Sequence, residues 1–398
     1  MSAGDAALVL ARNPGRDPGW RPPAGDEARA GSLHRALDGY APSPLHDVSG
    51  LAGATGAGAV LLKDESSRFG LPAFKALGAW WAAACTVAGH LGEPALATAP
   101  AALRERAARA APLTLACATE GNHGRAVARV ARSLGVAAHV VVPEGTARTR
   151  VAAIEAEGAL VERVAGDYDA AVAHAAGLAG PDVLVIADTS WPGYEEVPRR
   201  VVEGYGTIFA ELDEQLAGRP VDLVLVPIGV GSLAAAAARH LRARDDGSPP
   251  LLVGVEPAAA ACALASARAG HPVTVAPGPA SIMAGLNCAT PSAAAWPAVF
   301  AGFDAFCAIG DAHARRGLRR LAAAGLDRGA CAGGVAGALE ALLGDPGHRA
   351  ALDLPDRPAV LALLTEGVTD PGAFAAAVGR PPLQSTLPDG GAASGSPS

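Results

Sequence analysis

The sequence predicts an α/β fold built from two open, mostly parallel, twisted sheets with flanking helices. Short apolar runs recur along the chain, and alanine-rich stretches of helical length separate them. These runs are continuous rather than alternating, which is typical of parallel strands buried on both faces. A chain of 398 residues is long enough for two such domains with a crevice between them.

Eight apolar runs are bounded and composed like buried strands. The predicted strands span residues 59–63, 114–118, 138–142, 183–187, 221–227, 251–255, 306–309 and 359–364. Five stretches among them have the length and composition of helices. The predicted helices span residues 122–134, 147–156, 168–176, 195–216 and 312–324. Residues 1–35 and 380–398 have the composition of linkers, so we expect both ends to be disordered.

Bulk composition excludes several classes of partner. The net charge is −7 and basic residues do not cluster, which argues against nucleic acid and anionic membrane. The apolar stretches 76–89 and 223–238 are too short to span a bilayer, and no signal peptide is visible. Six cysteines without a CxxC pair indicate reduced thiols in a cytoplasmic protein. The ten histidines show no metal-ligand spacing, and we expect no structural metal.

Only two of the 32 basic residues are lysines, Lys63 and Lys75, and they lie twelve positions apart. Arginine replaces lysine on a solvated surface but cannot form a Schiff base. Lys75 follows the apolar segment Leu71-Pro-Ala-Phe74 and opens a predicted helix. Both the helix dipole and desolvation would lower the pKa of its amine. The segment therefore predicts an amine that forms an imine with a carbonyl cofactor.

Two turns between a strand and a helix add to this pattern. Thr119-Glu-Gly-Asn-His-Gly124 follows the strand 114–118 and brings its backbone and Asn122 to the carboxyl ends of the strands. Pro227-Ile-Gly-Val-Gly-Ser-Leu233 has glycines that free backbone N–H groups at a helix N-terminus, where a phosphate is favoured. Each turn alone is also compatible with an ordinary strand–helix connection.

The three segments in this order resemble the pyridoxal-phosphate enzymes of the tryptophan synthase β (fold type II) family, and within it the diaminopropionate ammonia-lyases. The resemblance covers about residues 40 to 375. It is carried by Lys63-Asp-Glu-Ser66, Arg68-Phe-Gly-Leu71, Ala73-Phe-Lys75, Gly121-Asn-His-Gly124, Asp188-Thr-Ser-Trp191, Gly193-Tyr194, Pro198, Ile282-Met-Ala-Gly-Leu286, Thr365-Glu-Gly367 and Thr369-Asp370.

The resemblance implies the cofactor site and the domains. Lys75 would bind pyridoxal 5′-phosphate as a Schiff base and take the α-proton of an L-substrate. Asn122 would bind the ring hydroxyl, and a glycine loop would cradle the phosphate. That loop consists of Gly229, Val230, Gly231 and Ser232. A large domain would comprise residues 36–75 and 196–379, and a small domain residues 76–195.

The resemblance also implies the substrate site. Glu120 and Asp188 would flank the substrate, bind the departing β-ammonium and manage its protons. A carboxylate opposite the lysine would also abstract the α-proton of a D-isomer. The remaining substrate residues would be Ser190, Trp191, Tyr194 and Gly285.

Structural roles remain open for several of these residues. Asp188 is also explained as a cap or turn residue and Glu120 as the partner of an arginine. Trp191 and Tyr194 fit aromatic core packing equally well. Further residues to which we assign structural roles are Lys63 in an ion pair, His123 in the turn and Met283 in the core.

Three positions depart from the family pattern. The acid at position 120 is usually aspartate, and the extra methylene of Glu120 shifts a general base by about an ångström, which puts activity on D-substrates in question. The small hydroxyl residue expected to meet the pyridine nitrogen is replaced by Leu364, so that Thr365 is the near candidate. Residues 326–332 fit the family's glycine/serine-rich loop poorly.

The sequence therefore predicts an ammonia-lyase that converts 2,3-diaminopropionate to pyruvate and two molecules of ammonia, as a cytoplasmic homodimer. The nearest alternative is an ammonia-lyase for serine, threonine or 3-hydroxyaspartate, or a β-replacement enzyme, with the same fold. An alternative of another class is a non-catalytic module that binds an amino acid or the cofactor.

Overall fold

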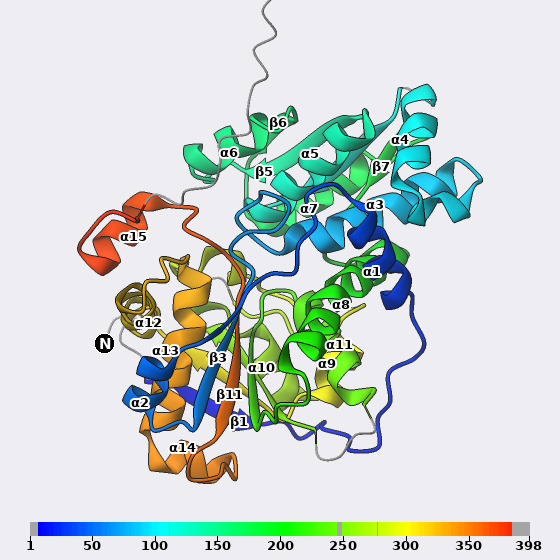
Figure 1. Cartoon of the computed structure of the whole chain (residues 1–398). Coiled ribbons are helices and arrows are strands. Elements are labelled where there is room, and N and C mark those ends of the chain that lie inside the picture. The colour runs from blue at the N-terminus through cyan, green and yellow to red at the C-terminus, as the bar shows by residue number, and fades with distance from the viewer. Residues whose placement is uncertain (1–6, 111, 245–248, 277, 384–398) are drawn as a thin grey trace, which may run out of the picture.

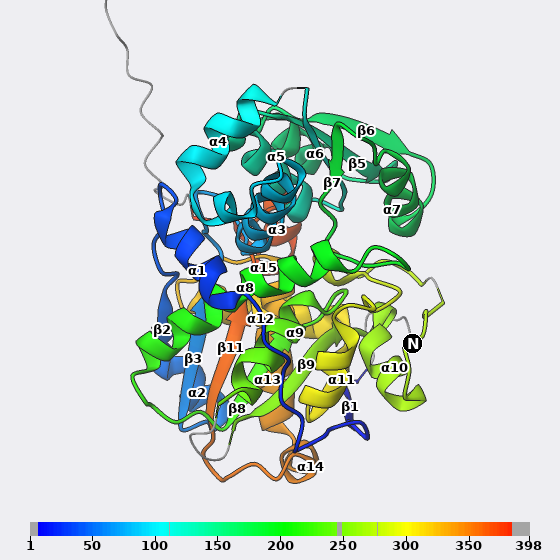
Figure 2. The same ribbon diagram turned by 90° about the vertical axis from the view of Figure 1, so that its right-hand side faces the viewer.

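The computed structural model describes residues 7–110, 112–244, 249–276 and 278–383. Figures 1 and 2 show a larger sheet below a smaller one, each covered by helices. The larger sheet has the strand order β1-β10-β9-β8-β11-β3-β2. Its strands are β1 (Val9–Arg12), β2 (Leu45–Asp47), β3 (Ala59–Asp64), β8 (Leu223–Pro227), β9 (Leu251–Pro257), β10 (Ala305–Ile309) and β11 (Ala359–Leu364).

The larger sheet is parallel except at its two edges, where β1 and β2 run antiparallel to their neighbours. Alternate residues of a strand face opposite sides of a sheet. Leu223 and Leu225 accordingly pack into one core and Val224 and Val226 into another. Helices on both sides are needed to keep these apolar faces from water.

Two groups of helices supply that cover. The first lies over Leu223 and Leu225 or extends that layer, and comprises α2 (Ser49–Thr55), η4 (Ala284–Leu286), α12 (Asp311–Ala323), α13 (Ala330–Gly344), α14 (Pro346–Ala351) and α15 (Pro371–Val378). The second lies over Val224 and Val226 and comprises α1 (Glu27–Ala36), α8 (Glu196–Leu216), α9 (Ser232–Arg242), α10 (Cys262–Ala269) and α11 (Trp296–Gly302). The short helix η3 (Ala258–Ala260) directly follows β9.

The smaller sheet is parallel throughout and has the strand order β6-β5-β4-β7. Its strands are β4 (Thr114–Ala118), β5 (Ala137–Pro143), β6 (Leu160–Val164) and β7 (Val183–Val185). Helices α5 (Asn122–Leu134) and α7 (Tyr168–Gly177) pack on it in separate apolar clusters. The remaining helices of this part are η2 (Pro94–Thr98), α4 (Pro100–Arg109) and α6 (Arg148–Glu155).

Helix α3 (Lys75–His90) connects the two parts, because it packs against α8 on one side and α5 on the other. The approach to α8 is close: a Cβ at Gly78 would lie 2.6 Å from the Tyr205 ring, and one at Gly204 would lie 2.7 Å from the Leu77 carbonyl oxygen. Glycine is therefore required at both positions. The helix that begins with Lys75 is thus held between the two layers.

Each predicted strand and each predicted helix overlaps an observed one, which confirms the α/β prediction. Three observed strands were not predicted, namely β1, β2 and β6. All three lie at sheet edges, are short and include charged or polar residues, so they lack the continuous apolar character of central strands.

The prediction of a disordered N-terminal segment is wrong for residues 7–35. Strand β1 pairs with β10, and α1 packs on α8 with Ala30 and Leu33 fully buried. The segment is rich in glycine, proline and charged residues, and this composition led to the prediction of disorder. Residues 1–6 lie outside the described residues.

At the other end, Arg380 forms an ion pair with Asp327, and the Leu383 amide donates to the same carboxylate. Residues 380–383 are thus fixed to the fold, contrary to the predicted tail disorder, and residues 384–398 lie outside the described part.

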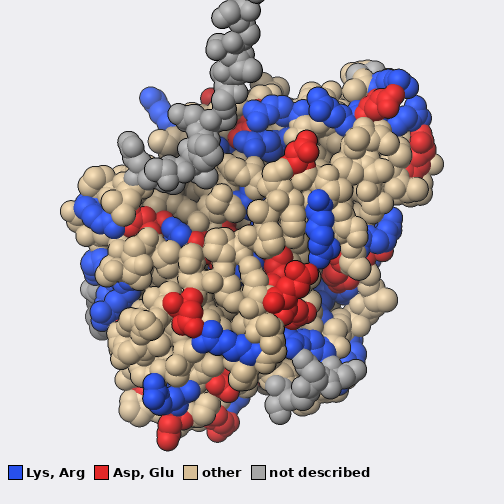
Figure 3. All heavy atoms as spheres, viewed as in Figure 1, with Lys and Arg blue, Asp and Glu red and all other residues tan. Residues whose placement is uncertain are grey.

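The domain boundaries given above stay a prediction. Within the described ranges no helix is both long and apolar enough to cross a membrane. Figure 3 shows basic and acidic side chains interspersed on one face.

Candidate active site

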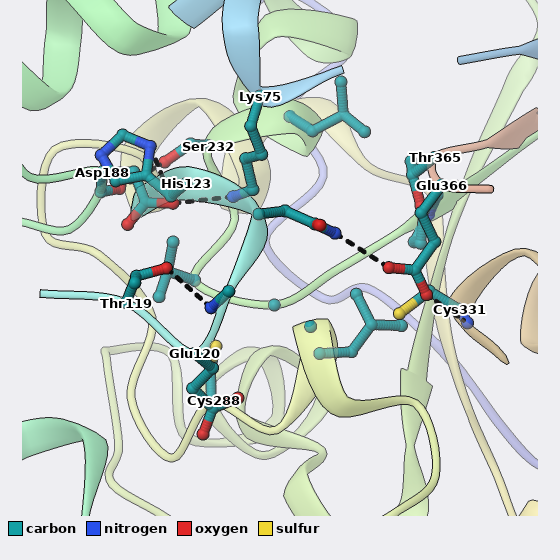
Figure 4. Close-up of a pocket in the computed structure, with 18 of the residues that line it drawn as sticks. Lys75, Thr119, Glu120, His123, Asp188, Ser232, Cys288, Cys331, Thr365 and Glu366 are labelled. Carbon is teal, nitrogen blue, oxygen red and sulfur yellow. Dashed lines mark hydrogen bonds and ion pairs between the residues drawn. The ribbon is translucent and has the colours of Figure 1, made fainter. Parts of the chain in front are cut away.

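A cavity lies at the carboxyl ends of strands from both sheets. It is lined by the segments that follow β4, β8 and β11, by Asp188 after β7 and by the start of α3 (Figure 4). The predicted residues that line it are Lys75, Glu120, Asn122, Asp188, Gly229, Val230, Gly231, Ser232, Gly285 and Thr365. The fold thus brings together positions from 75 to 365 of the sequence.

Lys75 is the first residue of α3, and its Nζ lies 2.7 Å from Oδ2 of Asp188. Burial acts to lower the pKa of Lys75, but the charge of Asp188 and the hydrogen bond to it raise the pKa above its usual value. The predicted lowering of the Lys75 pKa is therefore wrong for the ion-paired amine. The sequence did not show that a carboxylate 113 residues away would lie within hydrogen-bond distance.

Asp188 is the centre of a buried polar cluster. Burial acts to raise its pKa, but the charge of Lys75 and the hydrogen bond from it hold that pKa below its usual range. The Tyr168 hydroxyl donates to Oδ1 of Asp188 at 3.3 Å, and Nδ1 of His123 lies 3.8 Å from Oδ2. Asp188 therefore contacts the groups of the cavity rather than serving only as a turn residue. Tyr168 was predicted only as the start of a helix.

His123 has a defined orientation. Its Nε2 lies 2.7 Å from the carbonyl oxygen of Ile186, which can only accept, so Nε2 carries a proton. Nδ1 is buried and has no hydrogen-bond partner among the described residues. Burial lowers the pKa of His123, which favours the neutral ring with an unprotonated Nδ1 facing Asp188. Its bond to Ile186 agrees with the predicted role of a turn residue.

The turn before α5 is fixed by Thr119, whose Oγ1 accepts hydrogen bonds from the amides of Gly121 and Gly124 at 2.9 and 3.0 Å. A Cβ at Gly124 would lie 2.3 Å from Cγ2 of Thr119, so a side chain at that position would open the turn. Asn122 then lies at the first position of α5 and donates from Nδ2 to Glu366 at 2.9 Å. Glu366 had no predicted role.

The glycine loop precedes α9 and fits a phosphate. Gly231 has φ +99°, a left-handed conformation that favours glycine, and α9 begins at the next residue. Among the described residues, none accepts a hydrogen bond from the amides of Gly229, Val230 or Gly231. Unpaired amides at a helix N-terminus bind phosphate well. Oγ of Ser232 donates to the backbone carbonyl of Asp188 at 2.9 Å and so joins this loop to the carboxylate cluster.

Glu120 is partly buried at the cavity wall, and burial raises the pKa of its carboxyl to about 7 against the opposing effect of Arg150. Nη1 of Arg150 donates to the backbone carbonyl of Glu120 at 3.2 Å. No arginine of the described residues forms an ion pair with the Glu120 carboxylate. The structure therefore does not support the alternative role of Glu120 as an ion-pair partner.

Three predicted substrate residues do not line the cavity. Ser190 bonds to Ser292 and to the Ala294 amide. Trp191 and Tyr194 stack on each other with ring centroids 4.0 Å apart, and the Tyr194 hydroxyl bonds to the backbone at the end of β7. Aromatic packing is therefore the observed arrangement, and these three are left out of the substrate site proposed below.

The structural roles assigned to Lys63 and Met283 are confirmed. Nζ of Lys63 is buried and lies 2.7 Å from Glu211 in a cluster that also contains Arg68 and Glu65. Met283 is fully buried in the core beside α13.

Leu364 is buried in the same core as Met283, whereas Thr365 reaches the cavity. Two cysteines that sequence reasoning did not place, Cys288 and Cys331, also line it.

The fold and the cavity together define a pyridoxal-phosphate enzyme of fold type II: an amine at a helix start, an asparagine turn and a glycine loop with unpaired amides converge on one cavity. The sequence profile of the family described as "Pyridoxal-phosphate dependent enzyme" matches residues 36–364. The chain belongs to this family, and pyridoxal phosphate is its cofactor.

Comparison with individual proteins agrees. The chain is 36% identical to a diaminopropionate ammonia-lyase of Salmonella typhimurium over 301 aligned residues. These residues are 73% of this chain and 74% of that protein. Crystal structures of the Escherichia coli diaminopropionate ammonia-lyase superpose with a TM-score of 0.86 for the complex with D-serine, at 31% identity over 93% of this chain and 96% of that one. A complex of the same enzyme with an aminoacrylate–pyridoxal-phosphate intermediate gives 0.84 at 30% identity, again over 93% and 96% of the two chains.

Proposed function

We propose that the protein catalyses the elimination of ammonia from 2,3-diaminopropionate, which with water gives pyruvate and two molecules of ammonia. The observation that carries this proposal is the pair Lys75–Asp188, 2.7 Å apart, in a cavity also lined by Glu120 and by the glycine loop. Two carboxylates beside one amine suit a substrate that carries a second, positively charged amino group. The names of the relatives support the same substrate.

Four groups of this chain would hold the cofactor. Lys75 would bind its aldehyde through Nζ, Asn122 its ring and the amides of residues 229–231 its phosphate, with Thr365 as the candidate beside the pyridine nitrogen. When bound, pyridoxal phosphate condenses with the substrate's α-amine and withdraws electrons from the α-carbon. The orphan amides of the glycine loop are the feature of this structure that fits the phosphate.

The side chains then divide the proton transfers. Nζ of Lys75 accepts the α-proton, and Asp188 stabilises the resulting ammonium through its hydrogen bond. Glu120, with a pKa of about 7, is able to bind the β-ammonium as a carboxylate and to exchange a proton with it near neutral pH. Ammonia leaves readily only from the ammonium form, so a carboxylate near the β-carbon assists the elimination.

The main alternative is another ammonia-lyase or β-replacement enzyme with the same fold. An L-threonine dehydratase of Mycobacterium leprae is 41% identical over 162 residues, but these cover only 40% of this chain and 36% of that protein. Purified protein should be assayed for pyruvate or other keto-acid release from both enantiomers of diaminopropionate, serine, threonine and 3-hydroxyaspartate. We expect diaminopropionate to have the highest kcat/KM. A higher value for any hydroxy amino acid would contradict the proposed substrate.

The panel also tests the alternative of a non-catalytic binding module. Such a module would show the absorbance of bound cofactor without releasing any keto acid.

We also propose that the protein works in the cytoplasm as a homodimer. All six cysteines are free thiols, which supports a reducing compartment. The homodimer rests on the resemblance alone, and light scattering of the purified protein tests it. A monomer mass of 39.4 kDa in solution would contradict it.

A further inference from the structure

The carboxylate of Glu366 lies at the cavity wall on the side opposite Asp188 (Figure 4). It accepts a hydrogen bond from Nδ2 of Asn122 at 2.9 Å, although 244 residues separate the two. Glu366 follows β11 of the larger sheet, and Asn122 begins α5 over the smaller sheet. This bond therefore ties the two parts of the molecule together beside the cavity.

The Glu366 side chain is itself held in place. Its Oε1 accepts from the Cys331 amide at 3.2 Å, and its backbone carbonyl accepts from the Gly329 amide at 3.1 Å. A Cβ at Gly329 would lie 2.6 Å from Oε1, so glycine there leaves room for the carboxylate. Its backbone also forms an antiparallel bridge with Ala73, two residues before Lys75. The start of α13 and the segment before Lys75 thus fix Glu366 from two directions.

We infer that Glu366 is a positioning residue that orients the Asn122 amide for the cofactor ring. A carboxylate only accepts hydrogen bonds, so it selects the Asn122 orientation in which Nδ2 faces Glu366. Asn122 keeps its second Nδ2 hydrogen and its Oδ1 for a ligand. Such a charge-assisted bond is stronger than one to a neutral acceptor. The inference rests on the cofactor role proposed for Asn122, and it does not depend on the substrate.

The test compares Glu366→Gln and Glu366→Ala in the holoenzyme, each also in an Asn122→Ala background. Glu340→Gln is the control, because Glu340 lies on the same helix as Cys331 but forms an ion pair with Arg320 away from the cavity. The readouts are the dissociation constant of pyridoxal phosphate and the absorbance maximum of the bound cofactor with its pH dependence. Circular dichroism checks folding.

We expect Glu366→Ala to raise the cofactor dissociation constant about tenfold and Glu366→Gln about threefold, because the neutral amide still accepts a weaker bond. Both should shift the absorbance of the bound cofactor, and neither should have a further effect once Asn122 is alanine. Glu340→Gln should match the wild type. If Glu366→Ala does not fold, the isosteric Gln variant decides the question.

An unchanged dissociation constant and spectrum in Glu366→Gln would overturn the inference. So would an equal loss of affinity in the presence and absence of Asn122, because Glu366 would then act independently of it. A wild-type protein that binds the cofactor elsewhere than Lys75 would instead refute the proposed function, so the two failures are distinguishable.

Discussion

At the scale of single residues, the ion pair between Lys75 and Asp188 fixes a primary amine, which arginine would not supply, at the wall of the cavity. The amine has to be primary to form an imine, and the carboxylate keeps it oriented at the end of the cavity. The pair also shows why the pKa of such a lysine does not follow from its position on a helix alone. The partner charge outweighs burial, and it comes from a distant segment.

Replacing Asp188 by alanine should separate cofactor binding from turnover. Lys75 and the glycine loop are the proposed cofactor contacts, so the colour should remain. By contrast, kcat should fall by about 100-fold or more because the proton on Lys75 loses its stabilising partner. Visible spectra and steady-state kinetics check this, with the exposed Asp213→Asn as control. Normal turnover in Asp188→Ala would show that this carboxylate has no catalytic role.

Glu120 should give the reaction a pH dependence near neutrality. With a pKa of about 7, its ionised fraction rises from about one tenth at pH 6 to about nine tenths at pH 8. If the carboxylate binds the β-ammonium, kcat/KM for diaminopropionate should rise over this range. Glu120→Gln should remove that rise, while titration of the substrate itself contributes equally to both proteins. Identical pH profiles of the two would exclude the proposed role.

At the scale of elements, central strands and the helices between them follow from the sequence because they are continuous and apolar. The boundaries of α5 and β4 agree with the predicted ones to the residue. The edge strands β1, β2 and β6 do not follow, because pairing with a neighbour rather than composition defines them. Tertiary contact decides such short segments.

The turn before α5 offers a test at this scale. Gly124→Ala would place a methyl group 2.3 Å from the Thr119 side chain, and overpacking of this kind costs about 1–3 kcal/mol in unfolding free energy. Gly89→Ala in α3 is the matched control, since nothing lies within 4 Å of the added Cβ. Denaturant unfolding should show a lower free energy of unfolding only for Gly124→Ala. Equal stability of the two variants would mean that the turn is looser than described.

At the scale of the whole molecule, the sequence predicted which segments meet at the cavity but not every contact between them. Lys75, Asn122 and the glycine loop could be predicted because each lies on a segment between a strand and a helix, and Asp188 could be predicted through the family resemblance. The contacts of Tyr168 with Asp188 and of Glu366 with Asn122 could not be predicted, since the fold rather than a local motif brings each pair together. Trp191 and Tyr194 were placed at the substrate by resemblance, and stack on each other instead.

The ordered N-terminal segment affects the stability of the whole molecule. Leu33 of α1 is fully buried, so Leu33→Ala should lower the unfolding free energy by about 2–5 kcal/mol. Leu160→Ala is the control because Leu160 is 64% exposed, and it should change stability by less than about 0.5 kcal/mol. Thermal or denaturant unfolding measures both. An unchanged unfolding free energy in Leu33→Ala would mean that α1 does not pack on α8 in solution.

The bond proposed between Lys75 and the cofactor is the feature on which the proposed chemistry depends most directly. Borohydride reduction of the holoenzyme makes an imine permanent, and peptide mapping then locates the pyridoxyl group. The only other lysine, Lys63, is buried in its ion pair with Glu211 and serves as an internal control. We predict a label on Lys75 alone, lost together with the visible absorbance and the activity in Lys75→Ala. A label on Lys63, or none at all, would contradict the account.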